Sequence, residues 1–368
     1  MEYRRLMWYN YTVKFINKRS LELMKKYLIL ENGMTLEGES FGANVDTVAE
    51  IVFSTSMVGY VEALTDPRYV GQAVCMTFPV IGNYGVCEKD CERDLVMPSA
   101  LIVREYCDTP SNFRSEETLD ELLKKHGVPA ISGIDTRLLT KTLRTQGTMN
   151  GAIVSDPSSV SAEAIRAYRI KDAVGRVSTK SVSLYTSEEK GEHHTVALLD
   201  LGVTKSVLRT LNGLGCDVYV LPYTTSAEAI LALSPDGIFV SGGPGDPAEC
   251  TGVVETLSAL ISARIPTMAV GLGHQLLAAA NGMELKRLPH GHRGGNQPVR
   301  EVGTGRLYIT SQNHGYSVAA ANDTAVESYV NVNDGTNEGL CYRSSPAFSV
   351  QFTPHSDELY RSFVRMLG

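Results

Sequence analysis

The chain has 368 residues, of which 43% are hydrophobic and 20% are charged, and its formal net charge is -7. This length favours two domains, because a single hydrophobic core rarely grows so large. No stretch approaches the about 18 uninterrupted apolar residues of a membrane-spanning helix, and the acidic balance disfavours nucleic acid as the main partner. We therefore expect no membrane span, and partners that are small polar metabolites or another protein.

The seven cysteines are odd in number and show no paired spacing. This usage is typical of reduced thiols and predicts a cytoplasmic protein. Cys87 and Cys91 in "CEKDC" resemble the start of a metal site, but no second Cys or His pair follows at zinc-like spacing. We therefore predict no metal in this chain.

The first 23 residues are basic and lack the apolar stretch of a signal peptide. Their excess of Lys and Arg leaves a transit sequence as an alternative. Met24 then opens "MKKYLILENG", which has the pattern of a first strand. We interpret residues 1–23 as a disordered extension.

The next part of the chain begins with strand patterns. "YLILENGMTLEG" places two apolar runs around Asn32-Gly33, which predicts a hairpin, and "AEIVFSTSM" and "GQAVCMTFPV" continue the strands. Two helices are predicted, one capped by Ser115 in "SEETLDELLKKHG" and one running from its cap at Asp135 to Gly147. Residues 24–178 are thus predicted to form a strand-rich α/β domain.

Residues 179–194 are polar and without pattern, and we interpret them as a linker. In residues 195–368, buried-strand runs such as "TVALLDLG" and "DGIFV" alternate with short helical patterns such as "KSVLRTLNGLG". This alternation predicts a doubly wound, mainly parallel sheet, with ligands bound beyond the carboxyl ends of its strands. The glycine-rich turns "SGGPGDP" and "VGLGHQ" both fall at those ends.

The turn in "AVGLGHQLLAAANG" has the pattern of a strand-turn-helix elbow, on which some enzymes mount a nucleophile. Its apex is Gly271, with Gly273 as a small neighbour. Behind a thiol at the apex, the amides of Leu272, Gly243 and Gly245 would form an oxyanion hole. The alternatives are close packing of a helix on a strand and, more weakly, phosphate binding, although neither turn matches a phosphate-binding fingerprint.

From about Tyr27 to the C-terminus, ordered blocks carry a family resemblance: "FSTSMVGYVEALTDPRYVGQ", "GIDTRLLTKTLRTQGTMNGAI", "PDGIFVSGGPGDP", "GLGHQLLA", "HGHRGGNQPV" and "SQNHGYSV". The chain resembles the small, glutamine-handling subunits of carbamoyl phosphate synthetase. The resemblance implies that the second domain is a class I glutamine amidotransferase domain with a Cys-His-Glu triad. It also implies a large-subunit partner that receives ammonia and alone carries ATP and magnesium, no cofactor in this chain, and a place in arginine and pyrimidine biosynthesis.

Carried over residue by residue, the family's triad falls at Gly271, Thr353 and His355. The elbow normally reads G-I-C-L-G-H-Q and is here "AVGLGHQ", while the late H-P-E is here "TPH". Glycine has no nucleophile and threonine is no base near neutral pH. Because triad members act as a unit, losing one already costs nearly the whole effect. We predict that glutamine hydrolysis is lost, and we do not expect Cys250 or Cys341 to replace the thiol.

The resemblance also implies a glutamine pocket in which two residues depart from the family. Arg68 replaces the usual Ser, and Tyr316 stands where Phe is frequent. The Arg68 guanidinium either fills the pocket, pairs with a carboxylate of another ligand, or turns to solvent. The glutamine-binding positions are Arg68, Gly243, Gly245, Leu272, Gln275, Asn313, Gly315 and Tyr316.

Three functions follow from these changes. The first is a scaffold that supports an ammonia-fed large subunit. The second is a glutaminase with rewired chemistry, in which His355 activates water, or an amidotransferase for another amide. The third is a metabolite-sensing regulatory paralogue that holds glutamine or an anionic metabolite beside Arg68. A decayed product without function is the remaining possibility.

Overall fold

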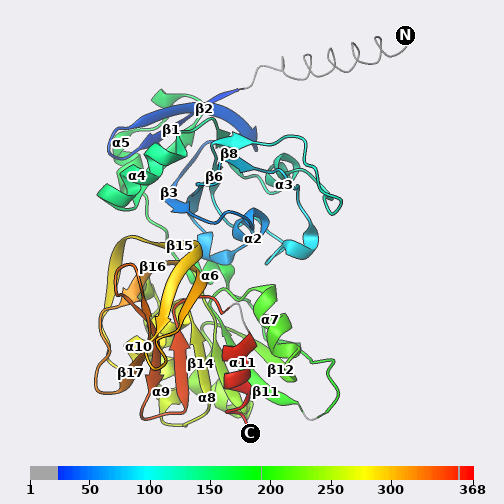
Figure 1. Ribbon diagram of the computed structural model, residues 1–368, viewed down its shortest axis with the longest axis vertical. Coiled ribbons are helices and arrows are strands. Elements are labelled where there is room, and N and C mark those ends of the chain that lie inside the picture. Colours follow the sequence, from blue (N-terminus) through cyan, green and yellow to red (C-terminus); the bar gives the residue numbers. More distant parts are fainter. Residues whose placement is uncertain (1–23, 192, 355–356) are drawn as a thin grey trace.

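The computed structural model describes residues 24–191, 193–354 and 357–368. Figure 1 shows an N-terminal and a C-terminal domain placed end to end. The predicted extension, residues 1–23, lies outside the described residues. None of the described helices is long and apolar enough to cross a membrane.

The N-terminal domain is built around a closed barrel in the order β1-β2-β8-β6-β4-β3-β9. The predicted hairpin at Asn32-Gly33 is confirmed, because the chain turns there between the antiparallel strands β1 and β2. Fully buried residues such as Leu28, Ile51 and Ile102 fill the barrel. The barrel strands are β1 (Lys25–Leu30), β2 (Thr35–Gly42), β3 (Thr47–Ser54), β4 (Gln72–Met76), β6 (Ala100–Ile102), β8 (Pro129–Ser132) and β9 (Met149–Val154), and a small sheet pairs β5 (Val80–Ile81) with β7 (Glu105–Tyr106).

The helices of this domain test the two predicted caps. The Asp135 carboxylate accepts the amide of Leu138 at the start of α4, which ends at Gly147, as predicted. The Ser115 cap is wrong: Thr118 caps α3 in a reciprocal box with Glu121. The helices are α2 (Tyr60–Leu64), α3 (Leu119–Lys125), α4 (Thr136–Gln146), α5 (Ala162–Ala167) and α6 (Ala173–Val177), with 3-10 turns η1 (Pro67–Tyr69), η2 (Glu88–Asp90) and η3 (Pro157–Ser159).

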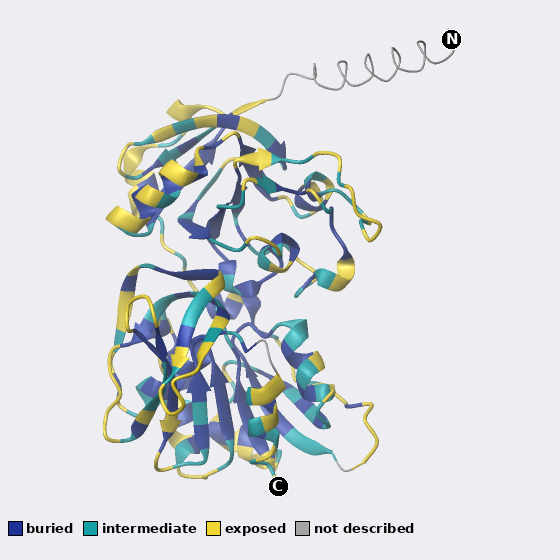
Figure 2. Ribbon diagram, viewed as in Figure 1, coloured by how far each residue is buried: buried dark blue, intermediate teal, exposed yellow. Residues whose placement is uncertain are grey.

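The C-terminal domain has the predicted α/β architecture. Strands β12, β11, β13, β14 and β19 are parallel neighbours at its centre, with α8, α9 and α10 packed on one face and α7 and α11 on the other. Figure 2 shows these central strands buried and the outer surfaces of the helices exposed. Their bounds are β11 (His194–Asp200), α7 (Lys205–Asn212), β12 (Cys216–Pro222), α8 (Ala227–Ala232), β13 (Gly237–Val240), η4 (Pro247–Glu249), α9 (Thr251–Ile261), β14 (Thr267–Val270), α10 (Leu272–Ala280), β19 (Ala347–Val350) and α11 (Asp357–Val364).

Antiparallel strands extend this sheet at both edges. The segment that we interpret as a linker contributes β10 (Ser183–Tyr185), which pairs with β12. On the other side follow β18 (Asn337–Tyr342), β17 (Ala325–Asn331), β15 (Leu285–Glu301) and β16 (Leu307–Val318). Strands β15 and β16 reach up to the N-terminal domain (Figure 1).

The upper part of β15 joins the two domains. The amide of Thr148 donates to the carbonyl of Pro289 at 2.8 Å, and Arg287 forms a 2.9 Å ion pair with Glu50. The amide of Gly295 donates to the Ser56 hydroxyl. Residues of both domains therefore surround the space next to the carboxyl ends of the parallel strands.

Candidate functional site

The elbow that the sequence predicts is present, with Gly271 between β14 and α10. Gly271 has φ 58° and ψ -117°, and its amide donates to the carbonyl of Val350 at 2.9 Å. Residues with a Cβ rarely adopt this conformation, which is the strained geometry expected of a nucleophile elbow. A Cβ at Gly271 would lie 3.3 Å from the Cα of Gly242, so a side chain would need only a small shift of its surroundings. The elbow is kept although the nucleophile's side chain is missing.

Gly273, two residues further on, has a different reason to be glycine. A Cβ there would lie 2.5 Å from the carbonyl oxygen of Val240. Its absence lets the start of α10 approach β13 closely. The close-packing interpretation of the turn therefore holds for Gly273, alongside the elbow geometry of Gly271.

A cavity of about 590 Å³ lies next to the elbow, between the two domains. It brings together every residue that the sequence assigns to glutamine binding: Arg68, Gly243, Gly245, Leu272, Gln275, Asn313, Gly315 and Tyr316. The volume is in the range of small-molecule sites. Gly271 and Thr353 are not among the residues that line it, and His355 lies outside the described residues.

Arg68 extends from the N-terminal domain to Thr353, the position at which the sequence resemblance puts a histidine. Its Nη1 donates to Thr353 Oγ1 at 2.8 Å, and its Nε and Nη2 donate to the Asp66 carboxylate at 2.8–2.9 Å. The two side chains are largely buried, with 17% of Arg68 and 7% of Asp66 exposed. Burial alone would lower the pKa of Arg68, but the charge and hydrogen bonds of Asp66 outweigh it and raise that pKa. Of the three orientations open from the sequence, the guanidinium takes the one that fills the pocket.

Two departures from the family pattern, Arg68 and Thr353, thus contact each other. Thr353 is held in place by its amide, which donates to the carbonyl of Ser311. The Arg68 guanidinium is hydrogen-bonded to the Thr353 hydroxyl and paired with Asp66, and Arg68 also lines the cavity. A cationic side chain therefore contacts the residue at the position where the family resemblance puts the histidine.

The opposite wall of the cavity is hydrogen-bonded within the C-terminal domain. Tyr316 donates from its hydroxyl to Asp246 at 2.7 Å, a bond that the more usual Phe cannot form. The Gln275 amide nitrogen donates to the carbonyl of Tyr316 and to Gln351, each at 2.9 Å. These bonds hold the glycine-rich turn before η4, the start of α10 and β16 in one rigid wall.

Besides Cys250 and Cys341, the histidine that follows the elbow, His274, could act as a base or nucleophile. His274 is fully buried and bonds Ser349 at 2.7 Å, and burial lowers its pKa to about 3, which keeps the ring neutral. Burial raises the pKa of Cys250 to about 11, and Cys341 is exposed on β18. None of the three lines the cavity.

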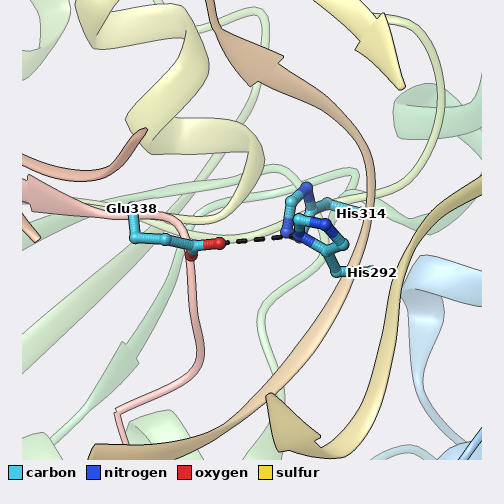
Figure 3. A group of neighbouring side chains, drawn as sticks. All are labelled: His292, His314 and Glu338. Atoms are coloured by element: carbon cyan, nitrogen blue, oxygen red, sulfur yellow. Dashed lines mark ion pairs between the residues drawn. The ribbon is translucent and has the colours of Figure 1, made fainter. Parts of the chain in front are cut away.

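One buried group among the described residues has the composition of a metal site: His292, His314 and Glu338 (Figure 3). His292 lies 3.5 Å from Glu338 and 3.0 Å from Asp334. His314 faces the carbonyl of Tyr316 and the Gln312 side chain. Because existing hydrogen bonds account for the ring nitrogens, we interpret the group as a support behind Asn313 and Gly315, and the absence of a metal stays a prediction.

Comparison with known proteins places this geometry in a family. Residues 28–153 match the model of the carbamoyl-phosphate synthase small chain, CPSase domain, and residues 197–358 match glutamine amidotransferase class-I. The chain is 44% identical to the "Carbamoyl phosphate synthase small chain" of Bacillus thuringiensis over 94% of this chain and 96% of the relative. It belongs to the carbamoyl phosphate synthase small-chain family.

Two further proteins are similar to this chain. The "Carbamoyl phosphate synthase pyrimidine-specific small chain" of Bacillus subtilis is 41% identical over 94% of this chain and 96% of the relative. A glutamine amidotransferase structure from Thermotoga maritima aligns with 48% of this chain and 85% of its own, at 18% identity and a TM-score of 0.36. The two family models and the Bacillus relatives confirm the family resemblance seen in the sequence and the α/β fold with an amidotransferase domain.

Sequence reasoning missed two side chains of the site. Asp66 neutralises Arg68, and its position before Pro67 at the start of η1 is a cap signal that the sequence offered. Arg293 lines the cavity and is 6% exposed. Nothing in "HGHRGGNQPV" by itself indicates that Arg293 points to this space.

Proposed function

We propose that this chain is the small subunit of a carbamoyl phosphate synthetase whose large subunit takes ammonia from solution. The small subunit supports the large subunit structurally and does not hydrolyse glutamine itself. The observation that carries the proposal is the Arg68–Thr353 hydrogen bond beside an elbow whose apex, Gly271, has no side chain.

Amide hydrolysis by this family's chemistry requires a nucleophile and a base that takes its proton. The elbow supplies neither group, and the guanidinium on Thr353 is a permanent cation that cannot accept a proton. The rewired alternative depends on His355 and on a water in place of the thiol. No described contact supports that alternative.

The retained architecture supports a structural role. Both family models match, and the 44% identity extends over 94% of the chain, although the triad positions have changed. We propose the large subunit as partner, with ATP and magnesium bound there and no cofactor in this chain. The product would serve pyrimidine synthesis, as the name of the Bacillus subtilis relative suggests, and arginine synthesis, in the cytoplasm.

Reconstitution with the large subunit of the same organism tests the proposal. Carbamoyl phosphate formation is measured with glutamine or with ammonium chloride, with and without the small subunit. We expect the small subunit to bind and to raise or stabilise the ammonium-dependent rate, with no glutamine-dependent rate. A family member with an intact Cys-His-Glu triad is the positive control. Efficient use of glutamine, or no association of the subunits, would contradict the proposal.

The sensor remains a second candidate because the cavity walls persist. However, the Arg68 guanidinium already forms an ion pair with Asp66 and a hydrogen bond with Thr353, so it is a poor anchor for an anionic metabolite.

A further inference from the structure

Three apolar side chains are strongly exposed on two loops beside the short helix α2. Met57 and Val58, in the loop before the helix, are 69% and 76% exposed, and Phe113, in loop 111–114, is 98% exposed. Single exposed apolar residues are common on protein surfaces, but a group of them with a polar border marks a site of interaction. Helix α2 lies at the end of the N-terminal domain that is nearest the C-terminal domain (Figure 1).

Hydrogen bonds fix both loops to one short segment beside the start of α2. The Tyr84 hydroxyl accepts the amides of Gly59 and Tyr60 at 3.0 and 3.1 Å, and the rings of Tyr60 and Tyr84 stack at 4.1 Å. The carbonyl of the preceding residue, Asn83, accepts the amide of Ser111 at 2.9 Å, two positions before the exposed phenylalanine. This segment therefore joins the two loops that carry the exposed side chains.

The loop before α2 is also fixed to the C-terminal domain. The amide of Thr55 donates to the carbonyl of Arg293 at 3.2 Å, and the amide of Gly295 donates to the Ser56 hydroxyl at 3.1 Å. The two exposed side chains that follow thus extend from a backbone that is anchored at both ends. A partner that covers them has little backbone entropy to overcome, so apolar burial contributes directly to its affinity.

The border of these side chains is acidic. A Cβ at Gly59 would lie 3.6 Å from the Glu62 carboxylate, so this acid lies next to the loop before α2. Arg114, next to the exposed phenylalanine, is already paired with Asp90. Helix α2 and segments 83–92 and 108–117 together carry seven Asp and Glu side chains but only two Lys and Arg side chains. Two copies of this surface would therefore repel each other, whereas a basic partner would be attracted.

We propose that Met57, Val58 and Phe113, with Glu62 at their border, form the surface on which the large subunit docks, through an apolar patch bordered by Lys or Arg. This assignment rests on the function proposed above and names the surface through which the small subunit acts. None of the three apolar residues lines the cavity between the domains. A partner on the loop before α2 would hold both domains in place, because that loop is bonded to each of them. Docking here does not depend on the elbow or on the triad positions.

Binding of the full-length chain to the immobilised large subunit, followed by surface plasmon resonance, tests this surface. We expect Val58→Glu and Phe113→Glu each to raise the Kd about tenfold or more, because each change buries a charge in an apolar contact. Val45→Glu is the matched control, since it makes the same change at another exposed valine of the N-terminal domain, between β2 and β3. It should leave the Kd unchanged.

Two further variants separate the apolar contact from the acidic border. Val58→Ile keeps an apolar side chain and should retain the affinity. Glu62→Lys should slow association and reduce its dependence on salt, because charges at the border of an interface act mainly on the association rate. The altered side chains are exposed, so thermal unfolding should show the same midpoint for each variant as for the unchanged chain.

The outcomes distinguish this assignment from the proposed function. If Val58→Glu and Phe113→Glu bind as tightly as the unchanged chain, or lose no more affinity than Val45→Glu, the docking surface lies elsewhere and only this assignment is overturned. An unchanged chain that does not bind the large subunit would overturn both. Self-association of the chain that Val58→Glu abolishes, without an effect on large-subunit binding, would give the surface to a second copy and overturn the assignment.

Discussion

The Arg68 contacts predict a measurable loss of stability in an Arg68→Ser variant. The guanidinium donates to both Asp66 oxygens and to Thr353, with 17% and 7% of the Arg68 and Asp66 side chains exposed. Breaking a buried ion pair from one side costs about 3–5 kcal/mol. In the variant, the Asp66 carboxylate still accepts hydrogen bonds from the backbone amide of residue 68, at 2.9 Å, and from the Asn313 side-chain amide, at 3.4 Å. We therefore expect a smaller loss, about 2–3 kcal/mol in the free energy of unfolding.

Urea denaturation followed by circular dichroism measures this loss, provided that the m-value is unchanged. Thr353→Val removes only the third bond of the guanidinium and should cost about 1–1.5 kcal/mol. Because both changes delete the same bond, the double variant should lose less than the sum of the two single losses. An Arg68→Ser chain within about 0.5 kcal/mol of the unchanged protein, or strictly additive losses, would refute the inferred pairing.

Three further predictions concern the elbow, the triad and a buried histidine. Gly271→Ala should lower stability by about 1–3 kcal/mol because φ 58° and ψ -117° are unfavourable for a residue with a Cβ, and an unchanged thermal midpoint would contradict the elbow strain. A triple variant with Gly271→Cys, Thr353→His and His355→Glu should release glutamate from glutamine only when Arg68→Ser is added. Each of the three changes alone should give no activity, because the triad acts as a unit. Activity of the triple variant with Arg68 unchanged would show that the guanidinium does not block the base. Burial would lower the pKa of His292, but two neighbouring carboxylates outweigh it and raise that pKa above 6.5, so its contribution to stability is complete below pH 6.5 and is lost as pH rises through the folded-state pKa. His292→Gln should remove this slope from the pH dependence of the unfolding free energy, and an unchanged slope would place the titrating group elsewhere.

Local patterns were sufficient for much of the fold. The hairpin at Asn32-Gly33, the Asp135 cap and the alternation from β11 to α10 each depend on residues close in the sequence. The choice of Thr118 over Ser115 depends on which residue has Glu121 three positions later. Barrel closure and the antiparallel strands β15 to β18 depend on pairings between distant strands, which periodicity does not specify.

In the site, too, local features could be predicted from the sequence, whereas contacts between distant residues could not. The eight positions that the motif blocks assign to glutamine binding all line the cavity, because each block is local. The decisive contact, from Arg68 to Thr353, joins residues 285 positions apart across two domains. The sequence therefore left three orientations of Arg68 open. It also gave no signal that Arg293 lines the cavity.

The source of nitrogen tests the central claim most directly. The reconstituted synthetase is given glutamine labelled with a heavy isotope in the side-chain amide nitrogen, together with unlabelled ammonium chloride, and the label in carbamoyl phosphate is measured. A small subunit without glutaminase chemistry predicts product that contains only unlabelled nitrogen. Label in the product, with matching glutamate release, would contradict the account.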